Sequence, residues 1–307
     1  MPAALLGGWV LDRVFADPRR WHPVAGFGRL AAALERALWR PNRAAGAVHT
    51  AILVGATSLL VSALDRTFKR SRLVGPGFRA AVVWIALGGR TLERTASALA
   101  RHLEADDLDR ARALAPSLVG RDPSFLDTAG LCRATVESVA ENSSDAIVAP
   151  LLWGALLGAP GAAAYRAANT LDAMYGHKDA RNLRFGWAAA RLDDLLNWPA
   201  ARIAALLAIL WAPAVGGRRA AAWRCAFVHG PAHPSPNAGR VEGAFAGALS
   251  RRLGGITHYP YGTEQRPVLG AGPPPAVADI ARAVKLCRVV GASSAALFAA
   301  LAWTISR

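Results

Sequence analysis

Residues 133–165 read RATVESVAENSSDAIVAPLLWGALLGAPGAAAY, and they join a charged segment directly to an apolar one. Glu137, Glu141 and Asp145 recur at every fourth position, which places all three on one face of a helix. The twenty residues that follow, 146–165, carry no formal charge. About 20 apolar helical residues cross the roughly 30 Å core of a bilayer. The stretch therefore predicts a membrane helix with a carboxylate face at its start.

Other segments have the same character. Residues 46–64 and 289–305 contain no Asp, Glu, Lys or Arg, and the shorter apolar runs 80–89 and 203–217 have an arginine at their edges. The mean hydropathy is +0.23, and 53% of the residues are hydrophobic. We predict an all-α, polytopic integral membrane protein with four to six membrane helices, forming a single domain over 1–307. Buried helices of a large soluble α-helical enzyme are the alternative, but several such long uncharged runs are rare there.

The positive charge favours a lipid surface over nucleic acid. The 36 Lys and Arg residues outnumber the 21 Asp and Glu residues, giving a net charge of +15. They form no stripe with interleaved aromatic residues, as a nucleic-acid interface would. They gather instead beside the apolar runs, where positive-inside anchoring places them: Arg66, Lys69, Arg70, Arg72, Arg218, Arg219 and Arg224.

The remaining segments are predicted from their periodicity and turn residues. Residues 91–114 have the spacing of an amphipathic helix outside the membrane. Asp122 or Ser124 is predicted to cap the helix that carries the carboxylates. Residues 226–275 are rich in Pro and Gly, so we predict mostly loop with short helices there, and no strand pattern is evident.

A break is predicted inside the apolar run 146–165. If this run simply crosses the bilayer, the carboxylate face before it and the polar residues after it lie on opposite sides. Gly158-Ala159-Pro160-Gly161 interrupts it, and Pro150 perturbs it. We therefore predict a re-entrant or broken helix, which membranes tolerate where it lines a protein cavity.

The three carboxylates are the first candidate site. Like charges four residues apart destabilise a helix by a few tenths of a kcal/mol per pair, so three in a row call for compensation. A Mg²⁺ ion bound by Glu137, Glu141 and Asp145 would provide it. A solvated helix face, helped by Arg133, is the alternative; proximity to the membrane favours a functional role.

Two further polar groups are candidates for substrate contact. Residues 166–197 mix arginines with carboxylates and amides, a combination that suits an anionic substrate, although the arginines equally suit lipid anchors. In HPSPNAG (233–239), prolines flank Ser235 and stiffen the backbone, which favours recognition over covalent catalysis. No P-loop and no G-x-G-x-x-G motif is present, and the three cysteines show no metal or disulfide spacing.

Four blocks of the sequence together resemble the CobD/CbiB family, whose members are adenosylcobinamide-phosphate synthases of cobalamin biosynthesis. They are ADPRRWHPV (16–24), the stretch 121–174 that contains the segment quoted above, FGWAAARLDDLLNW (185–198) and HPSPNAG (233–239). They occur in the family's order and span nearly the whole chain. One departure is the stretch before FGWAAARLDD, usually acidic and aromatic-rich in the family, which reads HKDARNLR here.

The resemblance implies a multi-pass enzyme of the cytoplasmic (inner) membrane. It would join a propionate carboxylate of adenosylcobyric acid to (R)-1-aminopropan-2-ol or its O-phosphate as an ATP-dependent amide ligase. Mg²⁺ would be its cofactor and ATP its co-substrate. The partners would be these small molecules, the lipid bilayer and possible other cobalamin-pathway membrane proteins, with no nucleic acid.

Each candidate residue has an expected role in this reaction. The expected metal ligands are Glu137, Glu141 and Asp145. The expected catalytic residues are these three with Asp172, Asp193 and Asp194. The expected substrate-binding residues are Arg133, Asn142, Arg166, Asn169, Arg191, His233, Ser235 and Asn237, with the arginines on phosphate oxygens.

Two other classes of protein remain as alternatives. A membrane prenyltransferase also binds a diphosphate through Mg²⁺ and acidic helix faces, but it predicts a second Asp-rich motif and leaves HPSPNAG without a use. A transporter predicts inverted repeats and polar residues in mid-helix. The charges here lie mostly outside the apolar runs.

Overall fold

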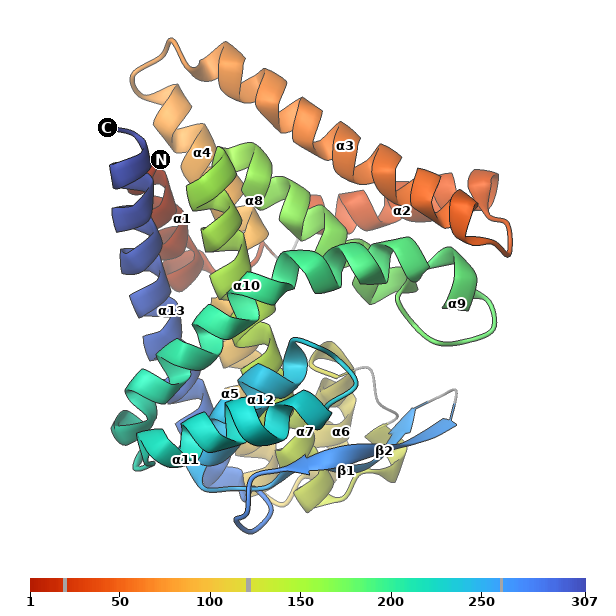
Figure 1. The fold of residues 1–307 in the computed structure, drawn as a ribbon, viewed down its shortest axis with the longest axis vertical. Helices are drawn as coiled ribbons and strands as arrows, with labels where there is room; N and C mark the ends of the chain where they lie inside the picture. The colour runs from red at the N-terminus through yellow and green to blue at the C-terminus, as the bar shows by residue number, and fades with distance from the viewer. Residues whose placement is uncertain (19–20, 120–122, 260–261) are drawn as a thin grey trace. The chain divides into compact units, whose positions relative to one another are not determined.

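The computed structural model describes residues 1–307 apart from 19–20, 120–122 and 260–261, and it consists mainly of helices (Figure 1). The chain forms two compact units, each assembled from separate stretches, and passes between them four times. Unit 1 comprises Met1–Gly88, Asp145–Asn197 and Ser294–Arg307. Unit 2 comprises Gly89–Ser144 and Trp198–Ser293. The single domain over 1–307 stays a prediction.

Unit 1 is a group of helices around an apolar core. Its elements are α1 (Pro2–Phe15), α2 (Pro23–Leu38), α3 (Arg43–Phe68), α4 (Val74–Ala86), α8 (Ala149–Tyr175), α9 (Asn182–Phe185), the first part of α10 (Trp187–Trp211) and the end of α13 (Val277–Ile305). His49 is buried within this core between the rings of Tyr175 and Phe185, and its Nε2 lies 3.0 Å from the Ala31 carbonyl. That contact explains how a histidine is accommodated in the apolar run 46–64.

Unit 2 combines short helices with a small sheet. Its helices are α5 (Gly89–Glu104), α6 (Leu108–Leu114), α7 (Thr128–Ser143), the later part of α10, α11 (Arg219–Arg224), α12 (Ala238–Leu249) and most of α13. Its short turns are η1 (Ala115–Ser117), η2 (Pro123–Phe125), η4 (Ala212–Val215), η5 (Cys225–His229) and η6 (Gly230–Ala232). Its strands are β1 (Leu253–Tyr259) and β2 (Gly262–Leu269). The helix predicted over 91–114 is present as α5 and α6, separated near Asp107, which caps α6.

Four segments of the described chain are long and apolar enough to cross a membrane: Arg43–Phe68, Thr128–Tyr175, Trp187–Val215 and Val277–Ile305. The predicted runs 46–64, 146–165 and 289–305 fall within them, as does 203–217 except for its last two residues, so the all-α polytopic architecture is confirmed. The run 80–89 does not form a fifth, because α4 has only 13 residues. Its length of about 20 Å is less than the hydrocarbon core.

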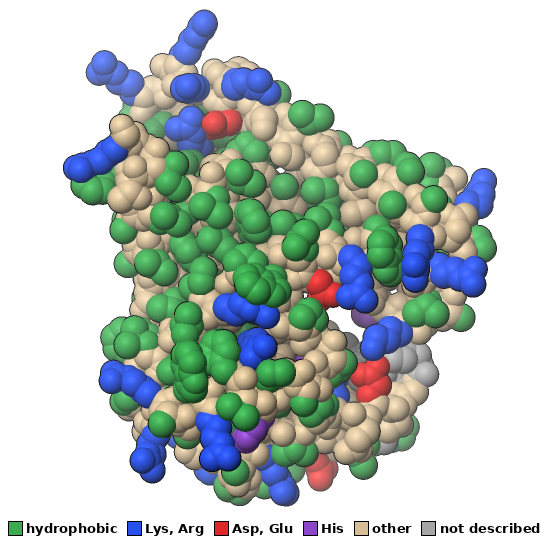
Figure 2. Space-filling view, viewed as in Figure 1, with side chains coloured by type: hydrophobic (Ala, Val, Ile, Leu, Met, Phe, Trp, Pro, Cys, Tyr) green, Lys and Arg blue, Asp and Glu red, His purple; other side chains and the backbone are tan. Residues whose placement is uncertain are grey.

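The surface of α3 fits contact with lipid. Only 17% of its apolar window is buried, and Leu59 and Leu60 are among its exposed side chains. The basic residues that follow α3 lie at one end of it, and Figure 2 shows Lys and Arg side chains gathered at the top of the view, where Figure 1 places this end. An apolar helix surface with a basic end is typical of a segment anchored at a membrane interface.

The predicted break in 146–165 is confirmed, and it lies at Gly158. Gly158 has φ 73° and ψ −165° inside α8, a region that is essentially restricted to glycine. The Tyr165 hydroxyl lies 3.1 Å from the Asp145 carbonyl, although twenty residues of straight helix would span about 30 Å. The two arms of α8 therefore fold back on each other as a helical hairpin (Figure 1). The arm from Asp145 to Gly158 is about 20 Å long, less than the thickness of the core.

This geometry makes a topological prediction. Cysteines introduced at Asp145 and Arg166, in a chain lacking its buried Cys132, Cys225 and Cys287, are expected to react with a membrane-impermeant maleimide from the same side. A cysteine at Leu157, exposed beside the bend, is the control and is expected to lie at a different depth. Reaction of positions 145 and 166 from opposite sides would contradict the hairpin.

One prediction for 226–275 is wrong: an antiparallel hairpin forms where loop was predicted. β1 pairs with β2 from Leu253 opposite Leu269 onward, with an irregularity between Leu253 and Gly255. Pro267 lies inside β2. Proline is tolerated there because in a two-stranded sheet each strand is an edge, where an N–H is not required on the outer side.

The predicted cap of the carboxylate helix is also wrong. Asp122 lies outside the described residues, and Ser124 belongs to the short turn η2. The N-cap of α7 is Asp127, whose Oδ1 accepts a hydrogen bond from the Gly130 N–H at 2.7 Å. An aspartate just before Thr128 satisfies the free N–H groups of the first turn.

Candidate functional site

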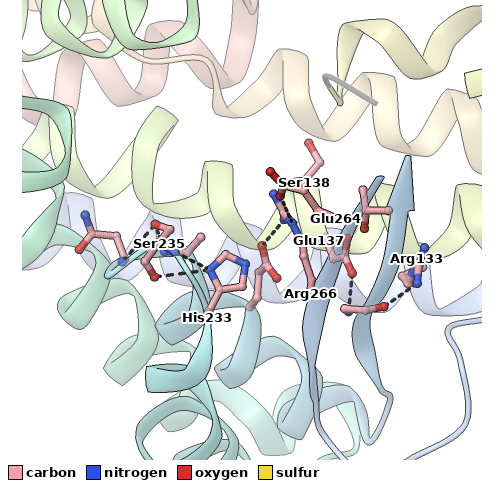
Figure 3. Close-up of polar contacts among 12 residues, drawn as sticks. Arg133, Glu137, Ser138, His233, Ser235, Glu264 and Arg266 are labelled. Carbon is pink, nitrogen blue, oxygen red and sulfur yellow. Dashed lines mark hydrogen bonds and ion pairs between the residues drawn. The ribbon is translucent and has the colours of Figure 1, made fainter. Parts of the chain in front are cut away.

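Two side chains of α7 hold the first strand of the hairpin in unit 2. The Arg133 guanidinium donates to the Gly254 carbonyl and, at 2.7 Å, to the Ile256 carbonyl. One turn later, Glu137 Oε1 accepts from the Gly254 N–H at 2.7 Å, with the residue only 2% exposed. Figure 3 shows Arg133 and Glu137 directed at the same strand. Residues four apart on a helix share a face, so one stripe of α7 fixes the start of β1.

A second charged group comes from α12 and β2. Glu242 lies in α12, is 1% exposed, and has Oε1 4.0 Å from Arg266 Nη1. Arg266 Nε is 3.9 Å from Glu264 Oε2. Burying a carboxylate is expensive unless an opposite charge accompanies it, and Arg266 is such a charge. We call Arg133, Glu137, Glu242, Glu264 and Arg266 the hairpin cluster.

The stretch 233–239 packs beside this cluster and is ordered by its own hydrogen bonds (Figure 3). The Ser235 N–H donates to His233 Nδ1 at 3.1 Å, and Ser235 Oγ accepts from the Ala238 N–H at 3.2 Å, at the start of α12. Arg202 Nη1 donates to Asn237 Oδ1 at 3.2 Å. His233 and Asn237 are each 7% exposed. The loop is thus held by its own hydrogen bonds, and the Ser235 hydroxyl accepts from N–H groups at the start of α12, whose N-cap is Asn237.

The other two predicted residues of α7 in unit 2 lie on its later turns. Asn142 Nδ2 donates to the Ser138 carbonyl at 3.0 Å, and Ser138 Oγ donates to the Leu118 carbonyl at 2.6 Å. Glu141 is half-buried. Asn142 therefore supports the helix locally, and its substrate contact stays a prediction.

A polar network in unit 1 joins three predicted residues to two others. Arg166 Nε donates to the Ala86 carbonyl at 2.7 Å, and Nη1 donates to Asn169 Oδ1 at 3.2 Å. Asn169 Nδ2 donates to Asp193 Oδ1 at 3.1 Å, across from α8 to α10. The network continues through Asn197, whose Nδ2 donates to Asp193 Oδ2 at 2.9 Å. The Tyr165 hydroxyl in turn donates to Asn197 Oδ1 at 2.8 Å. We call Arg166, Asn169, Asp193, Asn197 and Tyr165 the hairpin-base network.

The N-terminal block of the sequence reaches the same place. A Cβ atom on Gly88 would lie 3.5 Å from Arg166 Nη2 and 3.8 Å from Asp17 Oδ2, so both side chains border this glycine. His22 Nε2 lies 3.7 Å from Asp17 Oδ1. Described residues from three of the sequence blocks quoted above therefore meet in unit 1: Asp17 and His22 from the first, Arg166 and Asn169 from the second, and Asp193 from the third.

The remaining predicted residues are placed differently. Asp145 contributes its backbone carbonyl to the contact with Tyr165. The Asp172 carbonyl accepts from the Gly176 N–H at the end of α8. Arg191 Nη1 and Asp194 Oδ2 form an ion pair at 3.2 Å, with the arginine side chain 65% exposed. An ion pair with an exposed arginine adds little stability.

The divergent stretch before FGWAAARLDD has a local structural role. Burial would raise the pKa of the Asp179 carboxyl, but hydrogen bonds from the Asn182 side chain and from the N–H groups of Asn182 and Arg181 outweigh it and lower this pKa below its usual value. The charged carboxylate thereby stabilises the turn into α9. That contribution is present above the pKa of the unfolded chain and is lost as pH falls through the lowered value.

The predicted metal ligands fit a three-carboxylate site poorly. In the described part of the chain, no group of three or more His, Cys, Asp or Glu side chains is placed to hold a metal. One oxygen of Glu137 is also engaged by the Gly254 N–H. A Mg²⁺ ion that arrives on ATP phosphates needs only one or two protein carboxylates. Mg²⁺ therefore stays a prediction.

Sequence reasoning missed Glu242, Glu264, Arg266 and Tyr165. A signal for Glu242 was present: it is the one carboxylate in GRVEGAFAGAL, where glycines allow tight packing. A Cβ on Gly243 or Gly247 would overlap neighbouring backbone at 2.4–2.5 Å, so α12 is enclosed on these sides. Glu264 and Arg266 were assigned to loop, and their meeting with α12 depends on the hairpin.

Comparisons of the sequence with known proteins point to the same family. The family model described as CobD/Cbib protein matches residues 5–287. A protein of Mycobacterium tuberculosis (strain H37Rv) named cobalamin biosynthesis protein CobD is 54% identical over 293 residues, covering 95% of this chain and 93% of the relative. Proteins of the same name from Chromobacterium violaceum and Rhodobacter capsulatus are 45% and 39% identical, covering 93% of this chain and 90% and 91% of theirs. No solved structure matches.

Proposed function

Because the chain belongs to the CobD/CbiB family of cobalamin biosynthesis proteins, we propose that it forms an amide between a propionate carboxylate of adenosylcobyric acid and (R)-1-aminopropan-2-ol or its O-phosphate. ATP would activate the carboxylate. The observation that carries the proposal is the similarity over at least nine-tenths of both chains. Location in the cytoplasmic (inner) membrane is part of the proposal, supported by four apolar helices.

The chemistry requires activation because a carboxylate does not acylate an amine at neutral pH. In the proposed sequence, a carboxylate oxygen attacks the γ-phosphorus of ATP, the bond to ADP breaks, and an acyl phosphate forms. The amine nitrogen then attacks the acyl carbon, and phosphate leaves with the bridging oxygen. The nitrogen loses a proton to a base. Stabilising the charge on the transferring phosphoryl group dominates catalysis of such a step.

The two polar groups offer what these steps need. In the hairpin cluster, Arg133 and Arg266 supply positive charge beside the carboxylates of Glu137 and Glu242, which are candidates to accept the proton. In unit 1, Arg166 is held by a backbone carbonyl and by Asn169, so it is oriented before a ligand arrives. Orientation in advance reduces the entropy lost on binding.

The test is product formation by the purified protein in detergent. With adenosylcobyric acid, aminopropanol or its phosphate, ATP and Mg²⁺, we expect a corrinoid heavier by the amine less one water, detected by mass spectrometry. The product is expected to vanish without ATP. Confirmed membrane insertion with no product from either amine, even after addition of membranes containing the other enzymes of the pathway, would contradict the proposal.

A further inference from the structure

A pocket in unit 2 places Arg133 of the hairpin cluster next to a second arginine, Arg252, which has no role in the account above. It has a volume of about 380 Å³ and lies between the start of α7 and the first strand of the hairpin. Its wall includes the two arginines Arg133 and Arg252, the first turn of α7, and the backbone of Gly254 and Gly255. A volume of this size accommodates a small organic ligand.

The charge of this pocket favours an anion. Arg133 and Arg252 contribute two positive charges, and the N-terminal end of α7 adds a partial positive charge from its N–H groups. Asp127 is the opposing charge on the wall, and its carboxylate is engaged with the Gly130 N–H. The net charge of the side chains that line the pocket is therefore positive. Arginine is well suited to phosphate because its planar fork of donors matches two phosphate oxygens.

Glycine at two consecutive positions keeps this wall open. Gly254 and Gly255 have φ values of 83° and 89°, which residues with a side chain rarely adopt. A Cβ on Gly255 would lie 3.1 Å from Arg133 Nη1, so a side chain there would crowd the guanidinium. Close approach of a ligand to backbone and guanidinium is the usual reason for glycine beside a phosphate.

The two arginines differ in how they are held, which suits a binding site. Arg133 is held in place by the carbonyls of Gly254 and Ile256, so its charge is fixed before a ligand binds. Arg252 is exposed, and within the described part of the chain the hydrogen bond that holds it is one from its backbone N–H to the Pro273 carbonyl. Its side chain is therefore able to swing over a ligand that enters the pocket.

We infer that this pocket binds the phosphoryl group of a small phosphorylated substrate between Arg133 and Arg252. The inference rests on the proposed function, in which two reactants carry phosphoryl groups: the O-phosphate of the amine and ATP. The shared chemistry is a phosphate ester or anhydride with at least one terminal phosphoryl group. The pocket would thus discriminate between phosphorylated and free aminopropanol if the amine ester is its ligand.

The test compares Michaelis constants in the purified full-length protein. Arg252→Ala is expected to raise KM about ten- to a hundredfold for the phosphorylated ligand, the factor that corresponds to losing one hydrogen bond to a charged group. KM for free aminopropanol and for adenosylcobyric acid is expected to stay unchanged. Arg101→Ala, an exposed arginine of α5 elsewhere in unit 2, is the matched control and is expected to change none of these constants.

Each outcome either supports or overturns phosphoryl binding in this pocket. A raised KM for aminopropanol phosphate alone supports the pocket and identifies the amine ester as its ligand, whereas a raised KM for ATP alone supports it with the nucleotide as the source. Unchanged constants for both overturn the inference while leaving amide formation intact. If the wild type makes no product, calorimetric titration with aminopropanol phosphate and with ATP replaces kinetics. Equal binding, or no binding, in wild type and Arg252→Ala then overturns the inference separately.

Discussion

Glu137→Gln is expected to retain the fold and to lose at least about four-fifths of the activity. The amide oxygen of glutamine can still accept the Gly254 N–H, so the first strand of the hairpin stays attached to α7. The negative charge of the Glu137 carboxylate is lost, however, beside the strand whose carbonyls accept hydrogen bonds from Arg133. Replacing a charge-assisted hydrogen bond by a neutral one removes about 1–2 kcal/mol, which is roughly five- to thirtyfold in rate if it acts in the transition state.

Glu137→Ala separates the structural part of this role from the chemical part. Alanine leaves the buried Gly254 N–H without its acceptor, which destabilises the fold by about 1–3 kcal/mol. We expect a lower thermal midpoint for this variant than for Glu137→Gln, with activity at least as low. The measurements are product formation by mass spectrometry and thermal unfolding in detergent. Full activity of Glu137→Gln would show that the negative charge of this carboxylate has no role in the reaction.

The second large effect is expected at the bend of α8. Gly158→Ala puts a side chain at φ 73°, ψ −165°, and strain in that region is about 1–3 kcal/mol. Gly161→Ala acts differently: its Cβ would lie 2.4 Å from the Trp153 carbonyl oxygen and 2.5 Å from Leu157 Cβ, so the two arms must separate. Overpacking of this kind typically destabilises by about 1–3 kcal/mol.

Both variants are expected to unfold at lower temperature in detergent and to give a lower yield of folded protein. Gly55→Ala in α3 is the matched control, because a Cβ there meets no atom within 4 Å. In the interior of a helix, alanine is more favourable than glycine by roughly 0.5–1 kcal/mol. The control variant is therefore expected to be as stable as the wild type or slightly more stable. A thermal midpoint for Gly161→Ala equal to that of Gly55→Ala would contradict the close packing of the two arms.

The membrane helices were predictable because their signal is local. Uncharged runs such as 46–64 and 289–305 lie within the observed helices α3 and α13, and no tertiary information is needed to recognise them. The break at Gly158 was also predictable, since glycine and proline act on the backbone where they stand. The position of the α7 cap was not, because three acidic or hydroxyl residues within six positions were each suitable, and only packing selected Asp127.

The candidate sites depended on contacts that no local pattern contains. Spacing correctly placed Arg133 and Glu137 on one face of α7, but their partner is a strand more than a hundred residues later. The same holds for Asn169 and Asp193, which meet across two helices. Glu242 and Arg266 were missed because the hairpin that brings Arg266 to α12 was assigned to loop. Tertiary pairing of this kind overrides what propensity suggests.

ATP-dependent amide formation is tested most directly by following the oxygen atoms of the carboxylate. Adenosylcobyric acid labelled with ¹⁸O in the reacting carboxylate is incubated with the protein, ATP and the amine, and the released phosphate is analysed by mass spectrometry. Activation as an acyl phosphate predicts that one ¹⁸O atom passes to inorganic phosphate for every amide formed. Amide formation with phosphate that carries only ¹⁶O would contradict it.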